Sequence, residues 1–164
     1  MLDKYKISEA IAQIIEAIGE NPEREGLLDT PTRIAKMYAE LFSGINKDPS
    51  TCFDNTFEES HKDLVILSNI NFSSICEHHF LPFFGKAYIS YIPESKTAGA
   101  SKFAECVDIL SKRPQLQERL TSQIANTIFE TINPQGVEVL LHATHMCMSI
   151  RGVNKIGSKF VTHA

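Results

Sequence analysis

Residues 76–93, CEHHFLPFFGKAYISYIP, join a cluster of metal-ligating side chains to a strand pattern. Two residues separate Cys76 from His79, a spacing that lets both side chains bend onto one ion from a tight turn. Residues 83–92, which a proline follows, predict a β-strand, and residues 64–72 predict another before the cluster. We therefore expect the cluster to occupy the connection between two strands.

A second cluster, His145-Met146-Cys147, lies toward the C-terminal end of the chain. Residues 137–151 alternate around β-favouring side chains, which predicts one strand through this segment. An extended chain places every second side chain on the same face. His145, Cys147 and Arg151 should therefore point in one direction.

Two thiols and several imidazoles in two short clusters indicate a metal, and zinc is the first candidate because it binds both kinds of ligand. If Cys76, His79 and Cys147 are the ligands, one tetrahedral position stays open for water, as is typical of a catalytic zinc. His78 and His145 would then lie beside the metal without binding it. The alternatives are a closed structural site with His78 or His145 as fourth ligand, or two buried thiols among packed histidines.

The composition is that of a single globular domain. The chain has 164 residues, of which 43% are hydrophobic and 22% are charged. A net charge of -4 argues against a general nucleic-acid binder. No signal segment is recognisable and no apolar run approaches the roughly 18 residues of a membrane span, so we expect a cytoplasmic protein that is not bound to a membrane. In the cytosol the four cysteines should be thiols or metal ligands, with Cys106 in the core.

The N-terminal part of the chain predicts two helices. Isoleucines at helical spacing indicate the first helix over about residues 5–19. The second begins with Thr30 as N-cap and Pro31 at the first helical position, and Gly44 closes it. The polar segment 45–60 is typical of a long loop.

The remaining sequence predicts two more helices and two more strands. Ser101 can cap a helix that ends near Arg113, and apolar residues spaced by four indicate another helix over residues 116–132. A Pro-Gln-Gly turn leads into the strand that carries His145, and residues 160–162 predict a last short strand. The order of two helices, two strands, two helices and two strands favours an α+β domain with largely antiparallel strands.

With these residues in view, the sequence resembles GTP cyclohydrolase I over about residues 20–162. The resemblance rests on five blocks in the family's order: DTPTRIAKMY, CEHHFLPFFGKAYISYIP, GASKFAECVDIL, RPQLQERLT and HATHMCMSIRGV. It implies the tunnelling fold, in which a four-stranded antiparallel sheet and two helices follow an N-terminal helical extension. It also implies a barrel-shaped homodecamer with active sites between subunits. We accordingly expect one domain, with residues 1–60 as the extension and 61–164 as the catalytic core.

The resemblance further implies zinc-dependent conversion of GTP to 7,8-dihydroneopterin triphosphate and formate, the first step of tetrahydrofolate and pterin biosynthesis. The family's zinc ligands fall on Cys76, His79 and Cys147, and its non-ligand catalytic histidines fall on His78 and His145. The chemistry explains both roles, because water must attack C8 of guanine. Zinc can supply hydroxide near neutral pH, and an imidazole can protonate the departing ring nitrogen.

Recognition of guanine needs an acceptor for N1-H and the neighbouring amino group, and one carboxylate can accept both hydrogen bonds. The resemblance gives this role to Glu118, with Gln117 beside it. The alternative for Glu118 is that it only favours the start of its helix through the helix dipole.

Binding of three phosphates needs concentrated positive charge and backbone donors. The start of the helix at Ser101 offers free N-H groups, a hydroxyl and Lys102. The resemblance places Arg33, Lys36, Lys102 and Arg151 in the triphosphate pocket. Each of these cations alone is also compatible with an ordinary solvated surface.

Glu105 departs from the family pattern, because many members carry arginine at this position, three residues after the lysine of the Ser-Lys pair. An acid is unexpected where an anion binds. Two rival hypotheses remain, and only the first attributes altered substrate choice to Glu105. One is a related enzyme of the same fold that acts on a pterin or a deazapurine. The other is a non-catalytic assembly held together by zinc. Retention of both metal clusters and of Glu118 argues against the first, and the two extra histidines argue against the second.

Overall fold

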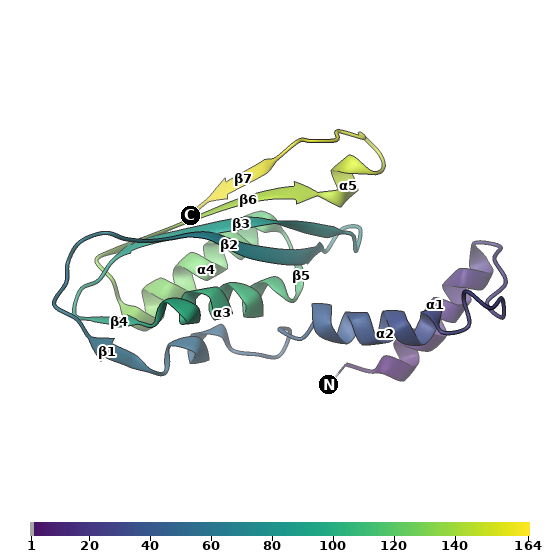
Figure 1. Cartoon of the computed structure of the whole chain (residues 1–164), viewed down its shortest axis with the longest axis horizontal. Coiled ribbons are helices and arrows are strands. Elements are labelled where there is room, and N and C mark those ends of the chain that lie inside the picture. Colours follow the sequence, from purple (N-terminus) through teal and green to yellow (C-terminus); the bar gives the residue numbers. More distant parts are fainter. Residues whose placement is uncertain (1) are drawn as a thin grey trace. The chain divides into compact units, whose positions relative to one another are not determined.

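The computed structural model describes residues 2–164, which divide into two compact units on either side of the Ser43–Gly44 bond. The first unit is a pair of helices, α1 (Lys4–Ala17) and α2 (Thr30–Leu41), that pack against each other (Figure 1). Asp3 caps α1 by accepting a hydrogen bond from the Lys6 N-H at 3.0 Å. The predicted helix near the N-terminus is confirmed.

The start and the end of α2 differ from the prediction. Asp29, not Thr30, is the N-cap, and its side chain makes no capping hydrogen bond. Thr30 already lies in the helix because Asp29 itself has near-helical backbone angles, φ -90° and ψ -10°. Pro31 still falls in the first turn, where a missing N-H costs nothing. The helix ends at Leu41, before Gly44, so Gly44 does not close it.

The second unit is built on a mainly antiparallel sheet in the order β5-β2-β3-β6-β7. Its four longer strands are β2 (Val65–Cys76), β3 (Pro82–Ile92), β6 (Gly136–His145) and β7 (Phe160–His163), all paired antiparallel. The two-residue strand β5 (Pro114–Gln115) pairs parallel with the end of β2. The predicted α+β class and the predicted strand directions are confirmed.

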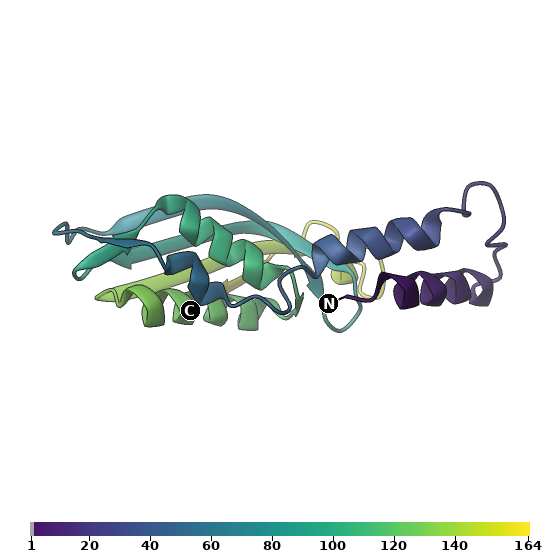
Figure 2. The same cartoon turned by 90° about the horizontal axis from the view of Figure 1, so that it is seen from below.

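Two helices, α3 (Ala100–Ser111) and α4 (Gln117–Ile132), cover one face of this sheet (Figures 1 and 2). Alternate β3 side chains point toward them, and the α4 residues spaced by four are fully buried. The core includes Phe83, Ala87, Ile89, Leu120, Ile124, Ile128 and Ile132, each 0% exposed. The opposite face carries exposed apolar side chains, among them Ile66, Phe84 and Val161. Among residues 2–164, no helix is long and apolar enough to cross a bilayer.

The segment expected to be a long loop contains two short elements. A 3-10 helix, η1 (Pro49–Phe53), is followed by strand β1 (Thr56–Glu58), which pairs with β4 (Lys96–Ala98). Phe53 is buried, and its ring packs edge-on against Phe103 with centroids 5.3 Å apart. This aromatic contact anchors the segment to α3, a tertiary effect that the polar composition did not indicate.

The predicted strand through residue 151 is wrong, because β6 ends at His145 and a helical turn, α5 (Met146–Ser149), follows. His145 pairs with Phe83 near the beginning of β3, so the chain beyond it has no neighbouring strand to bond. The residues after His145 instead close a turn, in which the Ile150 N-H donates to the Met146 carbonyl at 3.1 Å. Cys147 therefore reaches its position from a helical turn rather than from a strand face.

Candidate metal centre and active site

The first ligand cluster lies on a tight turn between β2 and β3. The Cys76 N-H donates to the Leu81 carbonyl, and the Phe80 N-H donates to the Cys76 carbonyl, both at 2.9 Å. Phe80 has φ 52°, a left-handed conformation that is unusual for a bulky residue and costs on the order of 1–3 kcal/mol. This turn, residues 76–81, brings His79 back beside Cys76, and it is called the metal turn below.

Three predicted ligands meet at one place in the structure. The ligand atoms of Cys76, His79 and Cys147 all lie within 4.8 Å of one another. Bonds of about 2.3 Å to sulfur and about 2.0 Å to nitrogen put the ligand atoms of a tetrahedral zinc roughly 3.5–3.8 Å apart. Small side-chain movements would therefore close the group around an ion. Two thiols and one imidazole form a donor set that zinc prefers.

Burial and two neighbouring residues shift the pKa of the Cys147 thiol. Burial raises its pKa, and the neighbouring Cys76 sulfur raises it further. Arg151 lowers the pKa of Cys147, which places this cation within electrostatic range of the thiol. The sequence prediction that Arg151 lies near the metal ligands is thus compatible with the structure. A helical turn, not a continuous strand, leads from Cys147 to Arg151.

A cavity of about 170 Å³ opens beside the three ligands. Its lining joins the metal turn, the first turn of α4 and the end of β6: Cys76, His78, His79, Gln115, Leu116, Gln117, Glu118, His145, Cys147, Met148 and Phe160. Both histidines predicted to be non-ligands line it, and so does the Glu118 carboxylate predicted to bind guanine. Four parts of the chain that are distant in sequence, residues 76–79, 115–118, 145–148 and Phe160, therefore form one site.

His145 is held on several sides. Its Nε2 lies 2.8 Å from Gln117 Oε1, and its ring stacks on Phe83 with centroids 4.5 Å apart and an interplanar angle of 6°. The Gln117 Nε2 donates to the carbonyls of Leu141 and Phe160 at 3.1 and 3.0 Å, which fixes the orientation of the amide. Gln117 Oε1 must then accept, so His145 carries its hydrogen on Nε2 and leaves Nδ1 unshared by Gln117.

Two threonine hydroxyls support Gln117 from behind. Thr121 Oγ1 donates to the Gln117 carbonyl at 2.7 Å, so the Thr162 hydroxyl, 2.6 Å away, donates to Thr121. Thr162 in turn accepts from Gln117 Nε2 at 3.0 Å. Gln117 is only 1% exposed, and its amide is occupied by protein groups. The residue predicted to lie beside a substrate base thus lies behind His145.

Electrostatic effects at His145 oppose each other. Burial lowers the pKa of this imidazole, because the charged form loses hydration. The Glu118 carboxylate raises it in part, which places Glu118 within reach of the ring electrostatically. The cavity thus brings an imidazole, which can transfer protons, and an acceptor carboxylate together beside the three ligands.

Known proteins resemble this chain over nearly its whole length. The sequence model of the GTP cyclohydrolase I family matches residues 7–164. This chain belongs to the GTP cyclohydrolase I family. The GTP cyclohydrolase 1 of Listeria monocytogenes serotype 4b (strain CLIP80459) is 56% identical over 164 residues, covering 99% of this chain and 87% of that protein. The GTP cyclohydrolase 1 of Streptococcus pyogenes serotype M1 is 57% identical over 162 residues, covering 98% of this chain and 84% of that protein.

Among solved structures, the archaeosine synthase QueF-Like in the apo form aligns with a TM-score of 0.49 and 19% sequence identity. The alignment covers 62% of this chain and 90% of that chain. Membership of the GTP cyclohydrolase I family rests on the sequence relatives and the family match.

The other residues predicted to bind substrate do not line this cavity. Ser101 lies inside α3, whose N-cap is Gly99, so the predicted Ser101 cap is wrong. Lys102 pairs with Glu105 at 2.7 Å in the same helix. Since α3 spans about 18 Å and is followed by Pro114, which pairs with the end of β2, its first turn lies at the end of the helix away from the metal group.

The two basic residues predicted on the second helix belong to the helical unit. Arg33 forms an exposed ion pair with Asp29 at 3.0 Å. Lys36 lines a small cavity between α1 and α2, together with Lys4 and Tyr5. Their roles in a GTP cyclohydrolase I remain predictions from the family resemblance.

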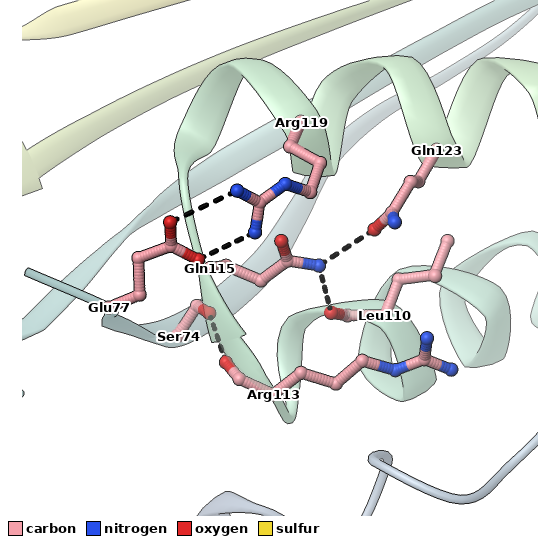
Figure 3. A network of polar contacts seen from close by, with 7 residues as sticks. All are labelled: Ser74, Glu77, Leu110, Arg113, Gln115, Arg119 and Gln123. Atoms are coloured by element: carbon pink, nitrogen blue, oxygen red, sulfur yellow. Dashed lines mark hydrogen bonds and ion pairs between the residues drawn. The ribbon is translucent and has the colours of Figure 1, made fainter.

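One pair of residues at the site was missed by the sequence analysis. Arg119 donates two hydrogen bonds to Glu77, at 2.6 and 3.0 Å, and so connects the metal turn to α4 (Figure 3). The partners are 42 residues apart. Glu77 lies within the Cys76–His79 cluster and Arg119 follows Glu118, but the motifs assign a role to neither. Opposite charges alone do not predict a contact between residues so far apart in the sequence.

Proposed function

We propose that this chain is a zinc-dependent GTP cyclohydrolase I that converts GTP to 7,8-dihydroneopterin triphosphate and formate. The observation that carries the proposal is one cavity bordered by three metal-ligating side chains, two further histidines and the Glu118 carboxylate. A structural metal site has little need for the extra histidines and the carboxylate. Relatives that cover nearly the whole chain and are named GTP cyclohydrolase 1 support the same activity.

We infer that Cys76, His79 and Cys147 hold zinc. The two sulfurs and one nitrogen lie close enough for a tetrahedral ion, and three protein ligands leave its fourth position open. When bound, the ion supplies a Lewis acid that can activate water near neutral pH.

The side chains around the ligands provide binding and proton transfer. Glu118 accepts hydrogen bonds from guanine N1-H and the 2-amino group, which orients C8 in the cavity. Release of C8 as formate takes two hydrolytic steps. One water adds to C8 and the first C8–N bond breaks, which leaves a formamide; a second water then adds to that carbon and the remaining C8–N bond breaks. Each departing nitrogen takes up a proton. His78 and His145 are the proton-transferring groups, with Gln117 fixing the ring of His145.

We further propose that the site is completed by other copies of the chain, in the tunnelling fold and the homodecamer of the family. The first turn of α3, with Ser101 and Lys102, is too far along that helix to reach its own cavity. The uncovered sheet face with Ile66, Phe84 and Val161 offers an apolar surface for assembly. In this arrangement residues 1–60 form the extension and residues 61–164 the catalytic core, and Arg33, Lys36, Lys102 and Arg151 bind the triphosphate of GTP.

The experiment that tests the proposed function is incubation of the zinc-loaded protein with GTP. We expect equal amounts of formate and a pterin that becomes fluorescent after oxidation, with about one zinc per chain. Cys147→Ser should lose zinc and activity together, whereas Cys52→Ser, a substitution in the core, should keep both. Absence of formate and pterin with zinc bound would refute the activity, and full zinc occupancy in Cys147→Ser would remove that residue from the ligand set.

A further inference from the structure

A bidentate ion pair joins two segments of the site that are far apart in sequence. The Arg119 guanidinium donates from Nη1 to Glu77 Oε2 at 2.6 Å and from Nη2 to Glu77 Oε1 at 3.0 Å. The planar fork of arginine matches a carboxylate in this geometry, so the pair fixes direction as well as distance. The Arg119 side chain is 44% exposed and the Glu77 side chain is 30% exposed. An ion pair this exposed contributes little to stability.

The same two segments are tied by a second set of contacts (Figure 3). The Glu77 N-H donates to the Gln115 carbonyl at 3.1 Å, and Ser74 Oγ donates to the Arg113 carbonyl at 3.3 Å. The buried side chain of Gln115 donates from Nε2 to the Leu110 carbonyl at 2.9 Å, which connects the segment to the end of α3. The backbone between α3 and α4 is therefore fixed against the end of β2, and the ion pair adds the link to α4 itself.

The neighbours of the two charged residues explain why this link matters. Glu77 lies between the metal ligand Cys76 and the catalytic candidate His78. Arg119 follows Glu118 in the first turn of α4. A movement of Arg119 relative to Glu77 would therefore change the separation between the metal group and the Glu118 carboxylate. That separation decides whether guanine can contact the carboxylate while its C8 faces the metal.

We propose that Glu77 and Arg119 are positioning residues that set the selectivity of the site for bases with both N1-H and a 2-amino group. This inference rests on the proposed function and adds the residues that place Glu118. A displacement of about 1 Å can cost on the order of 10²-fold in rate when a reacting group must be held in register. The pair acts on substrate choice through Glu118 and does not itself touch the reacting atoms.

The test compares GTP with inosine triphosphate, whose base keeps N1-H and lacks the 2-amino group. The variants are Glu77→Gln, which removes the charge at constant shape, and Arg119→Lys, which keeps the charge and loses the fork. For each, kcat and KM are measured for both nucleotides, together with bound zinc. We expect the ratio of kcat/KM for GTP over inosine triphosphate to fall roughly tenfold in both variants, mainly through KM for GTP, with zinc retained.

Two controls separate this effect from general destabilisation. Glu94→Gln removes an exposed carboxylate from an ion pair with Lys62 and should leave the nucleotide ratio unchanged. The double variant Glu77→Gln/Arg119→Gln should shift the ratio no further than Glu77→Gln alone, since both remove one interaction. A change in stability alone would lower the rates for both nucleotides by the same factor.

Two outcomes would overturn the inference. An unchanged nucleotide ratio in Glu77→Gln and Arg119→Lys, with zinc bound, would show that the pair does not place Glu118. Loss of zinc in both variants would assign the pair to the metal turn instead of to substrate choice. Neither outcome touches the proposed function, which fails only if the parent protein produces no formate from GTP.

Discussion

The first turns of α3 and α4 both contain polar and charged residues, yet these residues are paired in different ways. In α3, Lys102 pairs with Glu105 three residues further along the same helix. In α4, Arg119 pairs with Glu77, 42 residues away on the metal turn. A pair within one helix is a local property of its sequence and carries no information about neighbouring elements. A pair between elements fixes one part of the site relative to another, and the predicted guanine contact lies in the helix that is fixed in this way.

Among the substitutions that test this contrast, replacement of Glu118 in α4 should have the largest effect on GTP binding. Glu118→Gln keeps the shape but places an amide donor against one of the two guanine donors. An unpaired polar group in the bound complex costs about 1–3 kcal/mol, so GTP should bind roughly 5- to 150-fold more weakly. Zinc content should stay unchanged. The binding constant is measured by titration, with Glu130→Gln on the same helix as control, and equal affinity for parent and Glu118→Gln would place Glu118 outside the base pocket.

Loss of the Gln117 amide, which hydrogen-bonds His145, should have the next largest effect. Gln117→Met keeps the length of the side chain and removes the acceptor for His145 and the donor to two strand carbonyls. We expect turnover to fall by up to about 10²-fold and the free energy of unfolding to drop by about 1–3 kcal/mol. Steady-state kinetics and denaturant unfolding measure the two effects.

A control substitution sharpens the interpretation of this variant. Gln123 lies on α4, as Gln117 does, and accepts a hydrogen bond from Gln115. Gln123→Met removes this acceptor, and Gln123 makes no hydrogen bond to His145. It should lower stability modestly and leave kcat near the parent value. Normal kcat in Gln117→Met would show that His145 needs no support from the amide.

The comparison also shows what could be predicted from the sequence. The apolar residues spaced by four predict the helix over residues 116–132, because this period depends only on neighbours along the chain. Leu120, Ile124, Ile128 and Ile132 are all buried, whereas Leu116 is the N-cap of α4 and only partly buried. The three candidate ligands could be picked out because thiols and imidazoles are rare and occur in two compact clusters. These features are local, and the structure brings the ligands together as expected.

Features that depend on distant partners could not be predicted in this way. The end of β6 at His145 is decided by where β3 begins, so alternation along the chain overextended the strand. The contacts of Gln117 reach carbonyl groups 24 and 43 residues away. The Glu77–Arg119 pair has the same character. A single sequence gives the chemistry of these side chains but not their neighbours.

The local pair in α3 should give a smaller effect, with the opposite sign. Glu105→Arg frees Lys102 and adds a cation in the turn expected to face the triphosphate in the assembled protein. Two unit charges about 6 Å apart interact by roughly 3 kcal/mol at an effective dielectric near 20, and salt screening reduces this to about 1 kcal/mol or less. GTP affinity should therefore rise by up to about fivefold at low salt.

A salt series distinguishes repulsion between Glu105 and the triphosphate from an ion pair with Lys102 that has no effect on GTP binding. The gain in GTP affinity of Glu105→Arg should shrink as ionic strength rises, because exposed charges are screened within about 10 Å at 0.1 M. Asp108→Arg, a charge reversal on the same helix, should give a smaller gain if the effect depends on position. Equal affinities of parent and Glu105→Arg at low salt would show that Glu105 does not face the phosphates.

Two cysteines, one in α3 and one near α4, differ in burial, and their reactivity compares the two regions without any substitution. Cys106, on the buried face of α3, is 0% exposed, and burial raises its pKa to about 12. At pH 8 only about one molecule in 10⁴ carries the reactive thiolate there. Cys147, beside the first turn of α4, is only partly buried.

In zinc-free folded protein, iodoacetamide should therefore modify Cys147 while Cys106 stays unmodified, as read from peptide masses over time. Zinc should protect Cys147 and leave Cys106 unaffected, because only the first is a proposed ligand. Modification of Cys106 as fast as Cys147 would show that the α3 side opens to solvent and would remove the contrast between the two helices.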